Sequence, residues 1–249
     1  MSEQTSPAIR VQGLTKAFGR QRVLRELNLV VERGDFVTLL GPNVAGKTTL
    51  IRILATLSRP TQGQVWVHER SIWEDTRLVR AQVGLVSHQT FLYGDLTAEE
   101  NLRFYGRMYG VPHLNERIAY LLERVGLYER RHDRVRTFSR GMQQRLSIVR
   151  AILHDPPILL LDEPDTGLDQ QATRMLGELL GLLGSESRTI LMTTHHLERA
   201  LEFGRRVAIL CGGQISYESP TAGLSPKELA STYMELVERR LSPSRGSHP

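Results

Sequence analysis

The stretch that decides the fold is GPNVAGKT, residues 41–48. It matches the pattern G-x-x-x-x-G-K-[ST], in which backbone N–H groups surround a phosphate and the lysine adds a positive charge. An apolar run at residues 36–40 precedes it, and Leu50, Ile53 and Leu54 follow at helical spacing. A strand, a glycine-rich loop and a helix in this order open an α/β unit, so the stretch predicts a phosphate-binding loop.

Two side chains of this loop carry the expected chemistry. Lys47 is suited to reach the β and γ phosphates of a nucleotide, and Thr48 is suited to offer its hydroxyl to Mg²⁺. The helix that follows adds N–H groups and a favourable dipole. A glycine turn that merely precedes a helix is the simpler interpretation, which the full pattern in this context disfavours. The residues expected around the polyphosphate are Gly41, Pro42, Asn43, Val44, Ala45, Gly46, Lys47, Thr48 and Thr49.

A second element lies further along the chain, where the apolar residues 158–161 end in Asp162 and Glu163. Asp162 is suited to hold Mg²⁺ through water, and Glu163 to polarise an attacking water. Acidic residues often end strands, so this element alone is weak evidence. Together with the phosphate-binding loop it predicts a nucleoside triphosphatase.

Apolar periodicity and capping signals outline the remaining structure. Residues 90–153 are predicted to be mostly helical, with a capping box at Thr97 and Glu100 and a helix-stopping glycine at Gly126. This pattern indicates an α/β domain that a helical insertion interrupts. Further strands are predicted at 8–11, 27–31, 158–161, 189–192 and 207–210, and individual helices at 118–125, 141–153, 173–183 and 226–240.

The amino-acid composition indicates which broad class of protein the chain belongs to. The chain has 249 residues, of which 40% are hydrophobic and 24% charged, as in soluble globular proteins. No apolar run reaches the length of a membrane span, and the N-terminus lacks an apolar secretory segment, so we expect a cytosolic location, free or against a membrane. The single Cys211 fits a reducing compartment. The net charge of +5 suits nucleic acid or anionic lipid, but the interleaved acidic residues favour an ordinary arginine-rich surface.

The order of motifs becomes specific at Ser139, Arg140, Gly141, Met142 and Gln143, which precede the acidic strand. A phosphate loop, a helical insert, an S-x-G-x-Q signature and an acidic strand in this order resemble the ATP-binding cassette (ABC) ATPase family. The usual signature sequence of that family is LSGGQ. Here Phe138 replaces the leucine and Arg140 the first glycine, a variation tolerated in exporter-type members.

The resemblance implies a fold and a division of the chain. The fold is a P-loop NTPase, an α/β ABC-type nucleotide-binding domain with N-terminal antiparallel β strands and an inserted helical subdomain. It implies an ATPase domain at 8–220, with a core at 8–88 and 154–220 and the helical subdomain at 89–153. Residues 221–249 are expected to form a C-terminal helix, opened by a capping box at Ser225 and Glu228, and a frayed tail.

Residue roles follow from the same resemblance. Lys47, Glu163 and His195 are expected to be catalytic, with His195 as the switch histidine at the γ-phosphate and His196 out of register. Phe18 is expected to stack on adenine. The signature residues Ser139, Arg140, Gly141, Met142 and Gln143 are expected to bind the ATP of a partner cassette, and Gly167, Leu168 and Asp169 to contact that partner.

Two departures from the family pattern stand out. Val44 occupies a usual glycine position, and a positive φ there would cost about 1–3 kcal/mol, so Val44→Gly is expected to tighten ATP binding. The family's glutamine that links Mg²⁺, water and the transport partner falls in register on His88, with Gln89 one residue later. Either side chain suits the role, so the expected metal-site residues are Thr48, Asp162, His88 and Gln89.

The chain carries one cassette and no membrane domain, so the resemblance implies an integral membrane permease subunit, a second cassette, preferably identical, and ATP with Mg²⁺ as partners. Nucleic acid is not expected. The implied location is the cytoplasmic face of the cell membrane, held peripherally. Residues 83–111 resemble exporter-type cassettes. Their Ser-His-Gln sequence at residues 87–89 is similar to that of the haem exporter ATP-binding subunit of cytochrome c biogenesis.

Other members of the ABC family share much of the sequence at residues 83–111. Multidrug-type, lipid-type and ABC-2 exporters are alternatives within transport. A soluble assembly ATPase, as in iron–sulfur scaffold systems, and a non-catalytic nucleotide-binding regulator are alternatives outside it. Measured ATP turnover with Mg²⁺ separates the regulator from an enzyme.

Overall fold

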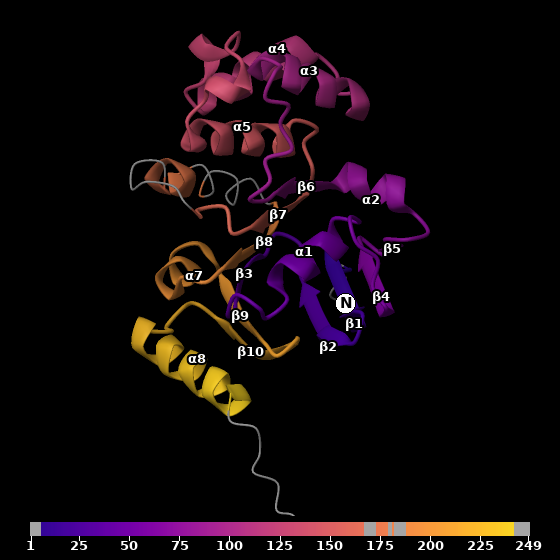
Figure 1. Cartoon of the computed structure of the whole chain (residues 1–249), viewed down its shortest axis with the longest axis vertical. Coiled ribbons are helices and arrows are strands. Elements are labelled where there is room, and N and C mark those ends of the chain that lie inside the picture. The colour runs from indigo at the N-terminus through magenta and orange to yellow at the C-terminus, as the bar shows by residue number, and fades with distance from the viewer. Residues whose placement is uncertain (1–5, 167–172, 179–180, 182–187, 242–249) are drawn as a thin grey trace, which may run out of the picture.

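The computed structural model describes residues 6–166, 173–178, 181 and 188–241, with side chains up to residue 238. Two sheets lie within these residues, one of six strands in the order β10-β9-β3-β8-β7-β6 and one of four in the order β2-β1-β4-β5. Figure 1 shows them below a group of three helices, α3, α4 and α5, with α8 at the opposite end of the molecule. The mixed α/β architecture predicted from the sequence is therefore confirmed.

The six-stranded sheet forms the centre of the fold. Strands β6, β7, β8, β3 and β9 run parallel, and β10 adds an antiparallel edge. Every residue of β3 and β7 is buried, which explains why both read as continuous apolar runs. The strands are β3 (Phe36–Leu40), β6 (Val83–Val86), β7 (Ile158–Asp162), β8 (Thr189–Thr194), β9 (Arg206–Cys211) and β10 (Gln214–Pro220).

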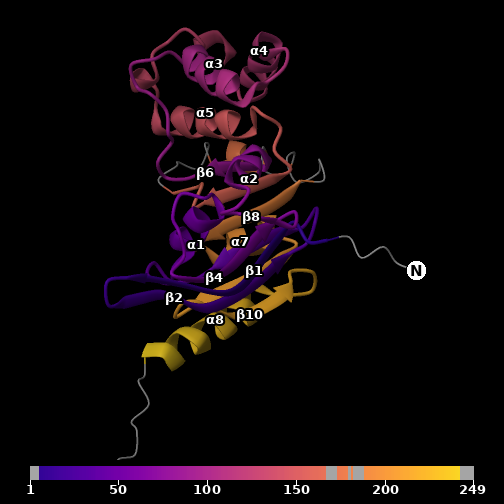
Figure 2. The ribbon, with the colours of Figure 1, turned by 90° about the vertical axis from the view of Figure 1, so that its right-hand side faces the viewer.

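The four-stranded sheet is antiparallel and packs beside the first (Figure 2). Its strands are β1 (Ile9–Phe18), β2 (Gln21–Val31), β4 (Gln62–Val67) and β5 (Arg70–Ser71). The predicted strands 8–11 and 27–31 cover only the start of β1 and the end of β2. The remainder of each strand exposes polar side chains, and the apolar periodicity is weaker there. Apolar side chains of β1, β2 and β4 share one core with helix α1 (Lys47–Leu54).

Three helices above the central sheet correspond to the predicted helical region: α3 (Ala98–Tyr109), α4 (Leu114–Arg124) and α5 (Arg140–Ile152). The capping box before α3 is confirmed, since Thr97 Oγ1 accepts from Glu100 N at 3.1 Å and Glu100 Oε2 accepts from Thr97 N at 2.8 Å. Gly126 has a φ of +63° just after α4, as a helix-stopping glycine requires. Buried side chains of these helices pack as one cluster against the sheet.

The last helix, α8 (Pro226–Leu241), begins at the predicted capping box, with Glu228 N donating to Ser225 Oγ at 3.2 Å. Leu229 of α8 is buried against β9 and α7 (Leu197–Phe203). Residues 173–178 are helical, as predicted, whereas most of the remainder of the helix expected at 173–183 lies outside the described residues. Helix α2 (Thr76–Gln82) completes the architecture. No described helix is long and apolar enough to cross a membrane.

Candidate functional site

The phosphate-binding loop joins β3 to α1 and directs Lys47 inward. Lys47 Nζ donates to Gly41 O at 2.7 Å and to Pro42 O at 3.2 Å, and its side chain is only 3% exposed. Glycine is required at two positions: a Cβ on Gly41 would lie 2.4 Å from Leu210 O, and Gly46 has a φ of +105°. Gly46 caps α1 without a side-chain hydrogen bond, which leaves the first N–H groups of the helix available to an anion.

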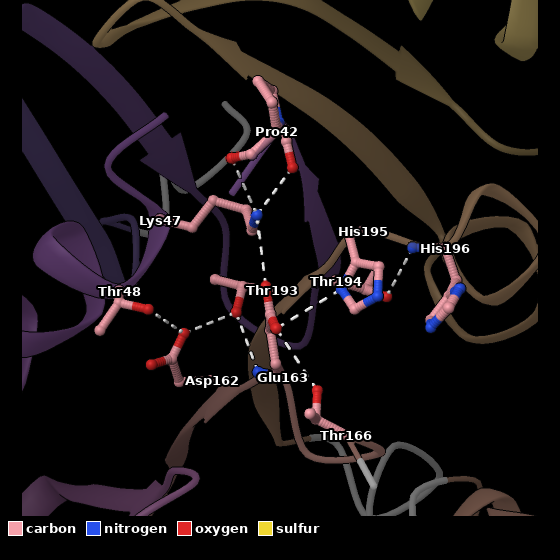
Figure 3. Close-up of polar contacts among 11 residues, drawn as sticks. Pro42, Lys47, Thr48, Asp162, Glu163, Thr166, Thr193, Thr194, His195 and His196 are labelled. Carbon is pink, nitrogen blue, oxygen red and sulfur yellow. Dashed lines mark hydrogen bonds and ion pairs between the residues drawn. The ribbon is translucent and has the colours of Figure 1, made fainter. Parts of the chain in front are cut away.

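Asp162 lies beside this loop at the end of β7 (Figure 3). Thr48 Oγ1 donates to Asp162 Oδ1 at 3.1 Å, and Thr193 Oγ1 donates to the same oxygen at 2.8 Å. Asp162 and Thr193 are buried. The strand order β3-β8-β7 brings these three residues together although they are far apart in the sequence.

Glu163 follows Asp162 with a φ of +46°, a left-handed conformation that non-glycine residues adopt mainly at constrained sites. Its N–H donates to Thr193 Oγ1 at 3.0 Å, which fixes the turn. Its carboxylate lies 3.3 Å from Lys47 Nζ and 3.4 Å from His195 Nδ1, and it accepts from Thr166 Oγ1 at 3.3 Å. The three residues expected to be catalytic therefore contact one another through Glu163.

His195 and His196 follow β8, and both side chains are exposed. Only His195 contacts Glu163 in the described residues; His196 lies further out, its ring 4.0 Å from that of His195. His195, and not His196, is thus the histidine that lies next to Glu163 in this part of the chain. Phe18 lies at the end of β1 and is 55% exposed, with Lys16 Nζ 4.8 Å from its ring centroid.

The donor atoms near Thr48 fit Mg²⁺. A hydroxyl and a carboxylate oxygen lie 3.1 Å apart, and Mg²⁺ prefers oxygen ligands, few from protein and the rest from phosphates and water. Among the described residues no group of three or more His, Cys, Asp or Glu side chains is placed to hold a metal alone. The site therefore suits an ion that arrives with a nucleotide.

His88 and Gln89 line one pocket together with Thr48 and Asp162. Both side chains are exposed, and Gln89 O accepts from Ser87 Oγ at 2.8 Å. The two residues thus remain equal candidates for the position next to the metal.

The signature begins helix α5, away from the phosphate-binding loop of the same chain. Ser139 caps the helix, its Oγ accepting from Met142 N at 3.3 Å, and Arg140 and Gly141 form the first turn. Gln143 donates to Phe138 O at 3.2 Å. Between residues 139–143 and the loop, no hydrogen bond or ion pair occurs among the described residues. The other expected partner-contacting residues, Gly167, Leu168 and Asp169, lie outside the described residues.

The strain expected at Val44 is absent, and that expectation is wrong. Val44 is not among the non-glycine residues with positive φ, and its side chain is 89% exposed. The loop meets its need for a left-handed residue at Gly46 instead. The structural reason for expecting Val44→Gly to tighten ATP binding is therefore removed.

Two residues of the site were not predicted. Thr193 binds both Asp162 and Glu163, and Thr166 binds the Glu163 carboxylate. Their sequence signals were the hydroxyl at the end of an apolar strand and the hydroxyl shortly after the acidic pair. Neither signal is specific without the strand order.

Residues 24–166 match the family model described as ABC transporter. The chain belongs to the ABC transporter family. It is an ATP-binding subunit of an ABC transporter and an ABC-type ATPase, as the sequence predicted.

Three curated relatives illustrate the similarity of this ABC cassette to characterised proteins. Linearmycin resistance ATP-binding protein LnrL of Bacillus subtilis is 34% identical, over 83% of this chain and 67% of its own. Nod factor export ATP-binding protein I of Cupriavidus pinatubonensis is 35% identical, over 96% and 74%. Daunorubicin resistance ATP-binding protein DrrA3 of Streptomyces coeruleorubidus is 35% identical, over 93% and 74%.

Solved structures agree with the ABC-type fold. An ATP-binding subunit of an ABC transporter superposes with a TM-score of 0.83 at 30% identity, covering 91% of this chain and 99% of that one. The dimeric structure of MJ0796, a bacterial ABC transporter cassette, gives a TM-score of 0.78 at 29% identity, covering 87% and 100%.

Proposed function

We propose that this cassette hydrolyses ATP to drive export through a separate membrane subunit. The observation that carries the catalytic part is the meeting of Lys47, Glu163 and His195 beside the phosphate-binding loop. Export is supported by relatives that are named for Nod factor export and for resistance to linearmycin and daunorubicin.

Each residue has a defined role in this proposal. Lys47 exchanges its carbonyl partners for the β and γ phosphates, which the N–H groups of the loop also bind. Glu163 orients and polarises the attacking water, and His195 contacts the γ-phosphate. Phe18 stacks on adenine.

Thr48 and Asp162 would hold Mg²⁺, with His88 or Gln89 nearby. The ion supplies charge stabilisation to the transferring phosphoryl group. Thr193 keeps Asp162 oriented by donating to its Oδ1. This support matters because a carboxylate that must bind an ion works best when its position is fixed.

The signature requires a second cassette. Ser139 and the N-terminus of α5 form an anion-binding helix start, separate from the loop of the same chain. We infer that it binds ATP held by a partner cassette, preferably an identical one, and that 167–169 contact that partner. The dimeric MJ0796 structure supports this arrangement.

The membrane subunit is proposed to dock where α3 and α5 meet the segment after β6. The working division of the chain is then a catalytic core at 8–88 and 154–220, a docking and signature subdomain at 89–153, and a C-terminal part at 221–249. The cassette would sit at the cytoplasmic face of the membrane. Haem as the cargo, as in cytochrome c biogenesis, is supported only by the sequence similarity of residues 83–111. The three relatives above are named for other cargoes.

A mild-detergent pull-down of the tagged chain from its own cell membranes tests the proposal. We expect an integral membrane protein to co-purify stoichiometrically and to raise ATP turnover. Cytochrome-assembly partners would favour haem as the cargo. Recovery with soluble partners alone would contradict transport and would favour an assembly ATPase.

A further inference from the structure

Helix α5, which begins at the signature, also contacts the turn that carries Glu163. The helix lies between α3 and α4 on one side and the central sheet on the other (Figure 1). From its second turn, Gln144 Nε2 donates to Pro164 O at 2.8 Å, and both residues are buried. Pro164 directly follows Glu163 in the chain. One side chain of the signature helix is therefore bonded to the residue next to the carboxylate that is proposed to polarise water.

Gln144 is a polar residue on a buried face of α5. Ser147, Ile148 and Ala151 share this face at helical spacing, and all are buried. A buried amide costs stability unless it is hydrogen-bonded, whereas an apolar side chain would fill the same space without that requirement. The amide at this position therefore points to its bond with Pro164 O rather than to packing.

The turn at Glu163 needs support from its surroundings. Glu163 has a φ of +46° and precedes a proline, although residues before proline favour extended backbone. Such a conformation persists only where neighbouring groups fix it. Glu163 N donates to Thr193 Oγ1 of β8 at 3.0 Å, and Gln144 of α5 binds the next carbonyl, Pro164 O. Two different elements thus hold the turn, and one of them is the signature helix.

Gln144 is close to the signature along the same helix. Ser139 caps α5, and Gln144 lies five residues further on, about 7.5 Å along the helix axis. A short stretch of α-helix moves as a unit, so a shift of its first turn also shifts Gln144. In the proposed function the ATP of the partner cassette binds at that first turn. A shift of α5 on binding would therefore reach Glu163 through Gln144 and Pro164.

We propose that Gln144 is a positioning residue for ATP hydrolysis, which places the Glu163 carboxylate through Pro164 and makes that placement depend on the signature helix. This inference rests on the proposed function, in which Glu163 polarises the attacking water and the signature binds the partner's ATP. Gln144 is buried beneath α5 and is bonded to the turn at Glu163. Its loss should therefore slow the chemical step and leave ATP binding intact, since misplacing a reacting group by about 1 Å can cost up to roughly 100-fold in rate.

The first test compares the full wild-type chain with Gln144→Met and Gln144→Leu. Both changes remove the amide donor and keep a side chain of similar size, and two variants are used so that the result does not depend on the folding of one. Thermal unfolding checks that each is folded. We expect kcat for phosphate release to fall by about tenfold or more, and the Kd for a non-hydrolysable ATP analogue to stay within about twofold of the wild type.

Ser147→Ala is the matched control. Ser147 is buried on the same face of α5, but its hydroxyl donates to Gln144 O at 2.7 Å, so this bond stays within the helix. The variant therefore loses a buried hydrogen bond of α5 without loosening the turn at Glu163. We expect its kcat to stay within about twofold of the wild type.

A double-mutant cycle with Glu163→Gln tests whether Gln144 acts through Glu163. We expect Gln144→Met to lower kcat about tenfold in the wild-type chain but less than about twofold in the Glu163→Gln chain, because the carboxylate that it positions is absent there. A residue that only supports the fold would lower kcat by the same factor in both chains.

A second cycle, with Ser139→Ala, tests the link to the signature. We expect Ser139→Ala to lower kcat at saturating ATP by a smaller factor in the Gln144→Met chain than in the wild type, because the path from the signature to Glu163 is already interrupted. Equal factors in the two chains would overturn this link.

The outcomes separate this inference from the proposed function. If the folded Gln144 variants keep kcat within about twofold of the wild type, or if Gln144→Met has the same effect with and without the Glu163 carboxylate, Gln144 is a core residue and the inference is overturned. An inactive Glu163→Gln would still support the proposed function in that case. Near-normal hydrolysis by Glu163→Gln would instead remove the proposed role of Glu163, and this inference with it.

Discussion

Lys47 and Glu163 form an ion pair, with Nζ of Lys47 3.3 Å from Oε1 of Glu163. The pair joins the phosphate-binding loop to the end of β7, and the side chain of Lys47 is almost wholly buried. In the proposed function, a γ-phosphate bound at Lys47 would compete with Glu163 for the same ammonium group. We therefore expect nucleotide binding to exchange one ion pair for another and to leave Glu163 free to face a water.

Glu163→Gln is expected to lower ATP turnover by about 100-fold or more while ATP binding is retained. The amide keeps the shape of the side chain and a hydrogen bond to Thr166, but it cannot act as a general base. Steady-state phosphate release measures turnover, and gel filtration with ATP and Mg²⁺ should show a dimer that persists. Glu198→Gln is the matched control: Glu198 is a nearby exposed carboxylate on α7 and should leave turnover near wild type. Near-normal hydrolysis by Glu163→Gln would refute Glu163 as the catalytic carboxylate.

His195→Ala is expected to lower turnover by roughly 10–100-fold, whereas His196→Ala should change it by less than about threefold. The reason is geometric: His195 Nδ1 lies 3.4 Å from Glu163 Oε2, while His196 has no contact with Glu163 within the described residues. Both variants are compared by phosphate release at saturating ATP. An equal loss in the two variants would show that the histidines act as a pair and that the predicted register is wrong.

The positions of Lys47, Glu163 and His195 illustrate what could be predicted from the sequence. The phosphate-binding loop and the acidic strand were predictable because each lies beside a continuous apolar run, which strands buried on both faces produce. The contact between Glu163 and His195 was not predictable from spacing, because it depends on β7 and β8 being neighbours in the sheet. Family resemblance predicted only that both residues lie near the γ-phosphate.

Three of the elements that the sequence did not predict carry a weak or short apolar pattern. Strand β10 alternates between exposed and half-buried residues, without a buried apolar side to mark it. Helices α2 and α7 have only seven residues each, too short for a clear 3.6-residue periodicity. The supporting hydroxyl of Thr193 was missed because a threonine at the end of an apolar strand has many ordinary roles.

His88→Ala and Gln89→Ala are expected to differ, with one of them lowering turnover at least about tenfold more than the other. Both side chains line the pocket that contains Thr48 and Asp162, but one position near the metal accommodates one ligand. Turnover is measured across a Mg²⁺ titration. Replacing the residue that acts through the ion should also raise the Mg²⁺ concentration needed for half-maximal turnover. Two small and equal effects would count against either residue serving this role.

Thr193→Val is expected to impair both stability and catalysis, because the Thr193 hydroxyl donates to Asp162 at 2.8 Å and accepts from Glu163 N at 3.0 Å. Valine keeps the volume but leaves these buried polar groups short of a partner, which costs about 1–3 kcal/mol in the free energy of unfolding. It also removes one of the two hydroxyls that donate to Asp162, so the Mg²⁺ concentration for half-maximal turnover should rise. Urea unfolding and a Mg²⁺ titration measure the two effects.

The control for this prediction is Thr38→Val on the neighbouring strand β3. Thr38 is equally buried, and its hydroxyl donates to Ala200 O at 3.0 Å, away from both carboxylates. We expect a comparable loss of stability with an unchanged Mg²⁺ requirement, because both valines remove a buried hydrogen bond but only one of them borders the site. If Thr193→Val behaved like Thr38→Val in the Mg²⁺ titration, Thr193 would be a structural residue of the sheet and Asp162 would be held by the rest of its surroundings.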